Sequence, residues 1–248
     1  MRPLPLVAVA LAPVLALGVF FYARSHRSRV GFSGLVWTFL LGAAVLVPSA
    51  AISLTLENLT GWTPRTPSLL GRFAGAMLIV ALVEESWKFL VVRLYAYDRP
   101  DFDEPYDGIM YAVVAALGFA TVENLLYVLA GGFGVGVLRA LLVVPGHAFY
   151  GVLMGYFLGE ARFAGGRVRA LRYQLIGFGL AVLAHGVYDF VVFSLDRRPL
   201  LILVLPVYAL LTWVVFFQAT RRHAEQSFRR HPALRDWPAG SDSDREER

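Results

Sequence analysis

Long apolar runs dominate the sequence and are separated by short polar or arginine-rich segments. There are seven such runs, over residues 4–23, 30–56, 69–97, 106–130, 137–158, 173–195 and 200–218. A helix needs about 20 predominantly apolar residues to cross a bilayer, and each run has about that length or more. The pattern therefore predicts an all-α fold: a polytopic membrane helical bundle with about seven transmembrane helices.

The composition agrees with a membrane protein. Of the 248 residues, 57% are hydrophobic and 17% are charged, and the mean hydropathy is +0.59. Soluble domains average about 45–50% apolar and about 25% charged residues. The chain has no cysteine, which excludes disulfides and cysteine-ligated zinc. The arginines behind the net charge of +5 lie mostly in the loops and the tail, where membrane topology explains them. We therefore expect the lipid bilayer, and no nucleic acid, as a partner.

Arginines between the runs predict an orientation. Three of the four segments that would face the cytoplasm are arginine-rich, at residues 24–29, 162–172 and 221–230. Because positive residues are retained on the cytoplasmic side, we expect a multi-pass protein of the cell membrane with its N-terminus outside and its C-terminus in the cytoplasm. The acidic turn at 98–107 is an exception on the inner side, and Arg197 and Arg198 are exceptions on the outer side.

Two parts of unequal size are expected along the chain. Residues 1–220 would form the membrane-embedded domain, and residues 221–248 a cytoplasmic, disordered tail that is polar and acidic beyond Pro232. The first run is expected to be an uncleaved helix rather than a signal peptide. No small-x-small cleavage site follows it, and its basic cluster lies on its C-terminal side.

Seven ionisable side chains lie in the middle of the apolar runs, away from the run ends, where insertion scales put the cost of each at about 2.5–3.5 kcal/mol. They are Glu84, Glu85, Lys88, Glu123, His147, His185 and Asp189. At about 100° of rotation per residue, Lys88, the only lysine, shares one wedge of its helix with the two glutamates before it. At about 1.5 Å of rise per residue, four helices carry these groups to one central to outer depth. The set must therefore pair internally or line a wet cavity.

Glutamates and histidines at one depth permit two routes to peptide hydrolysis. In the first, a glutamate is the general base on water while histidines stabilise the oxyanion. In the second, His147, His185 and Glu123 bind a divalent metal such as zinc and leave one position for water. No HExxH motif is present and Asp189 already gives His185 a partner, so the metal-independent route is favoured here.

Two other classes of protein could use the same polar residues. A proton- or ion-coupled transporter also places charged side chains at mid-membrane, although we see no internal repeat of the kind transporters often carry. A non-catalytic membrane scaffold is the third interpretation. It predicts that Glu84→Gln and His147→Ala leave every phenotype intact as long as the protein accumulates.

Four short motifs occur in order on successive runs. They are Glu84-Glu85-x-x-Lys88, then Asp107-Gly108 followed by Gly118-Phe119-Ala120 and Glu123-Asn124-x-x-Tyr127, then His147-x-x-x-Gly151, and last His185-Gly186-x-x-Asp189. In this order, over about residues 71–189, the chain resembles PrsW-type intramembrane proteases. That family is distantly similar to the CAAX prenyl proteases and their ABI relatives.

The resemblance implies a membrane-embedded endopeptidase, with a protease-like core at about 69–195, that cuts single-span membrane proteins. Anti-sigma factors are the substrate class it suggests, and a stress response is the outcome. By the same resemblance Glu84 is the base, alone or with His147, and His185 with Asp189 stabilises the oxyanion. Asp189 stands where the last motif of the CAAX relatives typically has Asn. The first and seventh runs and the tail lie outside the resemblance.

Overall fold

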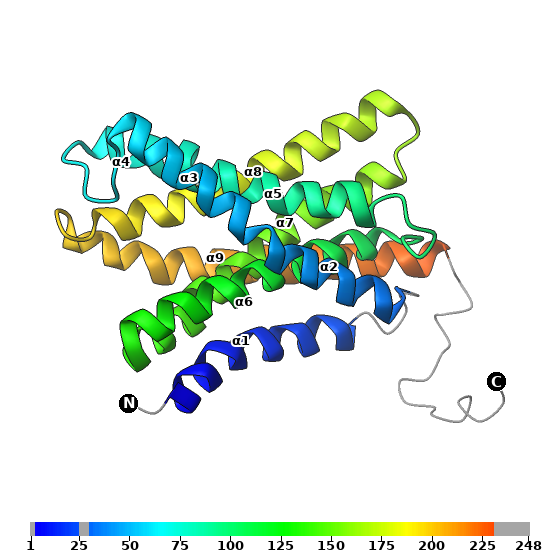
Figure 1. The fold of residues 1–248 in the computed structure, drawn as a ribbon. Coiled ribbons are helices and arrows are strands. Elements are labelled where there is room, and N and C mark those ends of the chain that lie inside the picture. Colours follow the sequence, from blue (N-terminus) through cyan, green and yellow to red (C-terminus); the bar gives the residue numbers. More distant parts are fainter. Residues whose placement is uncertain (1–2, 25–29, 231–248) are drawn as a thin grey trace.

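The computed structural model describes residues 3–24 and 30–230, with side chains as far as His223. Within these residues the chain is helical with no strand, and the helices lie side by side as a bundle (Figure 1). The predicted polytopic all-α fold is thus confirmed. Two of the predicted basic residues near the N-terminus, Arg27 and Arg29, and the tail beyond residue 230 lie outside the described residues.

The helices follow the seven predicted runs closely. In chain order they are α1 (Pro3–Arg24), α2 (Phe32–Ala44), α3 (Leu46–Thr60), α4 (Leu69–Gly75), the π-helical turn η1 (Ala76–Ala81), α5 (Leu82–Val91), the π-helical turn η2 (Val92–Ala96), α6 (Pro105–Leu138), the π-helical turn η3 (Arg139–Val143), α7 (Val144–Arg162), α8 (Arg167–Ser194), the 3₁₀ turn η4 (Pro199–Leu203) and α9 (Val204–Arg230).

Five helical stretches of the described chain are long and apolar enough to cross a membrane. One of them, Pro105–Arg162, has 58 residues and contains two passes. The stretch from α4 to η2 is not among the five, because it carries the charged wedge. The first residues of the predicted tail are helical, since α9 continues to Arg230.

Proline and glycine locate the bends. Between α2 and α3 the helix breaks at Val45, and Pro48 has no N–H to bond the carbonyl of Ala44. The predicted glycine-rich turn at 131–136 is reduced to one residue: Gly132 has φ 81° and ψ −172°, a conformation that favours glycine. The chain reverses there, and residues 133–138 already belong to the next pass.

Helices α6 and α7 form a closely packed antiparallel hairpin about Gly132. A Cβ added to the α7 glycines would strike the α6 backbone, at the pairs Gly151 with Ala112, Gly155 with Gly108 and Gly159 with Pro105. At Gly155 the added Cβ would lie 2.3 Å from the Gly108 carbonyl oxygen. Small residues let membrane helices approach until their backbones touch, so this hairpin is the most tightly fixed part of the bundle.

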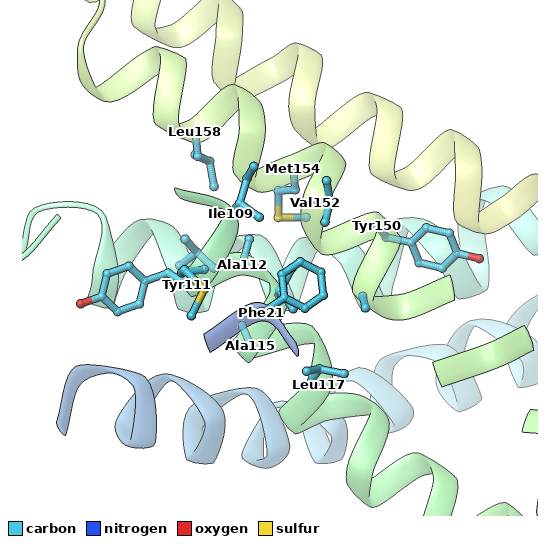
Figure 2. Close-up of a cluster of buried hydrophobic side chains, with 14 of the residues drawn as sticks. Phe21, Ile109, Tyr111, Ala112, Ala115, Leu117, Tyr150, Val152, Met154 and Leu158 are labelled. Atoms are coloured by element: carbon cyan, nitrogen blue, oxygen red, sulfur yellow. The ribbon is translucent and has the colours of Figure 1, made fainter. Parts of the chain in front are cut away.

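The hairpin is also the centre of the hydrophobic core. Figure 2 shows side chains of α6, among them Tyr111, Ala112 and Leu117, drawn together with Val152 and Met154 of α7. Helices α1 and α2 pack against α6, whereas α8 packs against α7. Polar groups carried by α5, α6, α7 and α8 can therefore meet beside this hairpin.

The two ends of the bundle differ in their polar contacts. At the end that holds residues 61–68, Gly132 and 195–198, called here the Gly132 end, the buried Arg72 forms an ion pair with Asp196 and bonds the carbonyl of Phe193. It also donates to the Thr66 carbonyl at 2.7 Å. One arginine thereby joins three segments.

The opposite end, called here the Asp101 end, holds residues 97–104 and 163–166. Its acidic turn is matched by arginines: Asp98 lies 2.9 Å from Arg93 and 3.5 Å from Arg162, and Asp101 accepts hydrogen bonds from Arg99. Partial burial would raise the pKa of the Asp101 carboxyl, but the Arg99 guanidinium and the Gly31 N–H hold that pKa below its usual range.

Candidate active site

The charged wedge of α5 is built around Lys88. Its Nζ lies 3.1 Å from Glu84 Oε2, 2.8 Å from Glu85 Oε1 and 3.1 Å from His147 Nδ1 of α7. An ammonium group has three N–H donors, and these three acceptors match them one for one. The side chain is 2% exposed and lies 4.1 Å above the Phe119 ring. Lys88 therefore holds the two glutamates together and joins them to the α6–α7 hairpin.

The contacts of His147 define its tautomer. Because Nδ1 accepts from the Lys88 ammonium, Nε2 carries the ring proton and donates it to Glu123 Oε2 of α6 at 2.8 Å. This side chain is 3% exposed. His147 is thus a neutral link between the α5 wedge and Glu123.

His185 of α8 lies between two carboxylates. Its Nδ1 is 2.9 Å from Glu85 Oε1 and its Nε2 is 3.3 Å from Asp189 Oδ2. The ring stacks on Tyr150 of α7, with centroids 4.7 Å apart, and its centroid lies 5.4 Å from that of His147. Two carboxylates and one aromatic face leave the imidazole little freedom to turn.

The structure therefore brings together all seven ionisable residues that the sequence singles out. Their exposure divides them into two layers. Glu85, Lys88, His147 and His185 have side chains no more than 5% exposed, whereas Glu84, Glu123 and Asp189 are 14%, 16% and 13% exposed. The three carboxylates are thus the members of the cluster whose side chains are partly exposed.

Two residues at this site were not predicted from the sequence. Arg139 of η3 places Nη2 2.9 Å from Glu123 Oε2, bonds Asn124 Oδ1 at 2.9 Å through Nε and covers the Tyr127 ring at 4.2 Å. Tyr150, which stacks on His185, was the other. The available signal for Arg139 was its charge at the outer end of an apolar run, on the side where the positive-inside rule disfavours it.

The residues present fit a divalent cation, but at a different place from the expected one. Among the residues that the structure describes, the ligand atoms of Glu84, Glu85 and His185 lie within 4.8 Å of one another, whereas His147 and Glu123 are outside this group. Glu85 Oε2 is buried and makes no hydrogen bond, so it remains an acceptor within the cluster. Two carboxylates and an imidazole are ligands that zinc-like ions take.

Fold and site together define a membrane enzyme: an acid–base cluster, partly exposed, inside a bundle of apolar helices. A family model described as PrsW family intramembrane metalloprotease matches residues 31–219. The chain belongs to this family and is an intramembrane protease. The predicted resemblance is confirmed, but it extends further than the motifs suggested, because the match includes the seventh apolar run.

Similar proteins named Protease PrsW occur in several bacteria. That of Geobacillus kaustophilus is 38% identical over 195 residues, which are 77% of this chain and 81% of the relative. That of Bacillus subtilis is 34% identical over 194 residues, 77% of this chain and 84% of the relative. That of Clostridioides difficile is 29% identical over 229 residues, 90% of this chain and 93% of the relative. No solved structure matches the chain.

Proposed function

We propose that this intramembrane protease cuts single-span membrane proteins, with anti-sigma factors as the substrate class, and that Glu84 is the general base. The observation that supports this most is the position of Glu84. It is the more exposed glutamate of the α5 wedge, at 14% against 1% for Glu85. It lies 3.1 Å from Lys88 Nζ and 4.0 Å from His185 Nε2. A base for hydrolysis needs this combination of access to water and a fixed orientation.

The reaction would begin when Glu84 takes a proton from water. The water oxygen then forms a bond to the carbonyl carbon of the scissile peptide, and the carbonyl oxygen becomes an oxyanion. His185, whose ring is fixed by Glu85 and Asp189, lies beside Glu84 and can donate an N–H to that oxyanion. The C–N bond breaks as Glu84 passes its proton to the leaving amine.

The deeper layer keeps these groups in place. Lys88 offsets the charges of Glu84 and Glu85, which would otherwise repel each other inside the membrane. His147 accepts from Lys88 and fixes its third N–H, so the ammonium cannot turn towards the substrate. These contacts position the base and the oxyanion donor before a substrate arrives.

The family description also implies a metal. Glu84, Glu85 and His185 are the residues that would hold a divalent cation, which as a Lewis acid would lower the pKa of a bound water and polarise the carbonyl. Lys88 occupies the space between the two glutamates, so its ammonium and a cation would compete there. We therefore retain direct catalysis by Glu84 as the proposal.

The test is cleavage of purified single-span membrane proteins, anti-sigma factors among them, by the protein in lipid vesicles. Glu84→Gln should lower kcat by about 10²–10⁴-fold, the usual contribution of a general base. Glu160→Gln, a membrane-helix glutamate of α7 outside the cluster, is the matched control and should cut normally. Chelators should not change the rate. Zinc that is stoichiometric, and is lost and restored together with activity, would contradict the metal-independent mechanism.

A further inference from the structure

Helices α8 and α9 touch near the Gly132 end of the bundle and separate towards the Asp101 end. Where they touch, the ring centroids of Tyr188 and Tyr208 are 5.9 Å apart, and Tyr208 donates a hydrogen bond to the carbonyl of Ala184 at 3.0 Å. Further along, the two helices diverge (Figure 1), while both still pack against α7. A space therefore opens between α8 and α9, and α7 forms its floor.

Both sides of this space are fixed by contacts with α7. At Gly177 of α8, an added Cβ would lie 2.7 Å from Phe157 Cβ and 3.0 Å from the Met154 carbonyl oxygen. On α9, the buried ring of His223 stacks on Tyr156, with centroids 4.1 Å apart. Because each helix is held against α7, the space between α8 and α9 is part of the packed fold.

The space is an apolar cleft of about 240 Å³, called here the α8–α9 cleft. Its apolar lining comes from all three helices: Leu153, Tyr156 and Phe157 of α7, Leu180 of α8, and Val215 and Ala219 of α9. Leu180 and Val215 are also exposed at the surface of the bundle, so hydrocarbon can reach the cleft from the side. An apolar cavity of about 150 Å³ already binds benzene, so the cleft has room for part of an acyl chain.

Two arginines border the cleft towards the Asp101 end. Arg222 belongs to its lining. Arg169 is on the same face of α8 as Leu180, because 11 residues turn a helix by about 1,100°, only about 20° more than three full turns. Tyr173 shares this face, and its ring centroid lies 6.3 Å from that of Phe157. Both arginines are exposed, and neither makes an ion pair with another residue whose side chain the structure describes.

Charge decides which occupant suits the cleft. Glu160 of α7 also lies at this end, but its carboxylate is 3.4 Å from His223, so Arg169 and Arg222 remain available to an anion from outside the chain. A transmembrane helix of another protein carries its own positive residues on the cytoplasmic side, where the Asp101 end is expected, and would be repelled. Arginine binds phosphate through paired hydrogen bonds, and basic pockets between membrane helices bind anionic head groups.

We propose that the α8–α9 cleft binds one anionic phospholipid, with an acyl chain along the apolar lining and the phosphate at the end bordered by Arg169 and Arg222. Gln218, which lines the cleft about one turn before Arg222, is placed to donate to an ester carbonyl of the lipid. The bound chain would fill the space that α8 and α9 leave open and would brace α8, which carries His185. This binding does not depend on the proposed function.

The first test compares two lipids that differ only in the head group. The full-length protein is purified in a neutral detergent and titrated with dioleoylphosphatidylglycerol or dioleoylphosphatidylcholine, and native mass spectrometry counts the lipids bound. One phosphatidylglycerol should bind about 30-fold more tightly than phosphatidylcholine, the preference expected for two arginines at a lipid surface. Equal binding of the two lipids would contradict the proposal. Glycerol 1-phosphate has the anion without acyl chains and should not compete; competition at the same concentration as the lipid would show that the apolar cleft is not used.

The second test removes the arginines one at a time. Arg169→Gln and Arg222→Gln should each lower the affinity for phosphatidylglycerol by about fivefold. The matched control is Arg167→Gln, which removes another exposed arginine of α8 that lies about 160° round the helix from Arg169. It should bind the lipid like the wild type. Equal losses in all three variants would indicate general attraction to a basic surface and would contradict a defined site.

The third test fills the cleft and keeps both arginines. Leu180→Trp should lose most of the bound phosphatidylglycerol, whereas Leu175→Trp, at an exposed position about 140° away on α8, should retain it. Unchanged binding in Leu180→Trp would show that the acyl chain lies elsewhere. Unfolding temperatures without added lipid verify that each variant is folded, and should Leu180→Trp not fold, the arginine variants decide. Displacement of phosphatidylglycerol by an equal concentration of a single-span membrane peptide would show that the cleft binds protein helices, and the proposal would be wrong.

Discussion

At the scale of single residues, Lys88 explains how a membrane helix carries two adjacent glutamates. Its three acceptors come from two helices and point in three directions, as the tetrahedral N–H groups of an ammonium require. A guanidinium presents its donors in one plane and needs more room. This geometry gives a physical reason for the only lysine of an otherwise arginine-based chain.

Two substitutions of Lys88 should therefore distinguish the contribution of its charge from that of its shape. Lys88→Met leaves two buried carboxylates without their cation, and breaking a buried pair typically costs about 3–5 kcal/mol. We expect a lower unfolding temperature in detergent and no cleavage. Lys88→Arg should recover part of the stability but little activity, because the planar fork cannot bond all three acceptors. Full activity of both variants would show that Lys88 has no role in positioning.

The sequence was sufficient to predict the depth of the site residues in the membrane, but not which of them contact one another. Rise per residue puts Glu84, Glu123, His147 and His185 at one level, and the structure brings them into one cluster. Depth does not give the angle about each helix axis, so it cannot distinguish which histidine shares a cation site with which glutamate. Arg139 was missed because it lies near the end of its run, where an arginine is usually taken as a loop residue.

At the scale of helices, π-helical turns determine the angle of each side chain about its helix axis, which could not be predicted from the sequence. The turn η1 directly precedes α5, and η3 directly precedes α7. A π-helical turn adds a residue to the local repeat, which rotates everything that follows it. The faces of Glu84 and His147 therefore depend on these two turns, and periodicity at 3.6 residues per turn does not predict them.

The closeness of α6 and α7 can be tested with one glycine. A Cβ at Gly155 meets backbone atoms of Gly108 and Ile109, so Gly155→Ala must push the helices apart. Overpacking of this kind costs about 1–3 kcal/mol. Because the same shift moves His147 away from Glu123, cleavage should fall along with the unfolding temperature.

The control for that variant is Gly179→Ala in α8, where an added Cβ meets nothing within 4 Å. Alanine is the better helix former, so the control should be neutral or slightly stabilising, with unchanged activity. Equal effects of the two substitutions would show that the α6–α7 contact is not the reason for the loss.

At the scale of the whole molecule, the order of the apolar helices and their approximate number could be predicted because the apolar runs are long and the breaks are short. The reversal at Gly132 is the clearest case. A cluster of glycines in the sequence predicts a turn, and in the structure Gly132 alone has the non-helical backbone conformation of that turn. Less predictable was the extent of α8, which begins at Arg167. Three of the arginines expected in the preceding loop therefore lie in its first two turns.

The exposed arginines at the two ends of the bundle predict its orientation in the membrane. At the Gly132 end, Arg72 and Arg139 lie against Asp196 and Glu123, and Arg65, Arg197 and Arg198 are exposed. At the Asp101 end the acids of the turn are matched by arginines, and further arginines are exposed beside it, at Arg167, Arg169, Arg172 and Arg222. More exposed arginines therefore lie at the Asp101 end than at the Gly132 end, and we expect the Asp101 end to face the cytoplasm.

Reporter fusions check this orientation. A fluorescent protein that folds only in the cytoplasm should be bright when fused after Arg222 or inserted after Gly165. Gly165 lies in the turn 163–166 of the Asp101 end, and the neighbouring His223 lies 3.4 Å from Glu160, close to that turn. Alkaline phosphatase, which is active only outside, should be active when inserted at Thr63, at the Gly132 end. Active phosphatase after Arg222 would contradict this prediction and show that the orientation is the reverse. The partly exposed carboxylates lie in the half of the bundle towards Gly132. With the reversed orientation they would lie in the inner half of the membrane, and the substrate would be cut there instead of in the outer half.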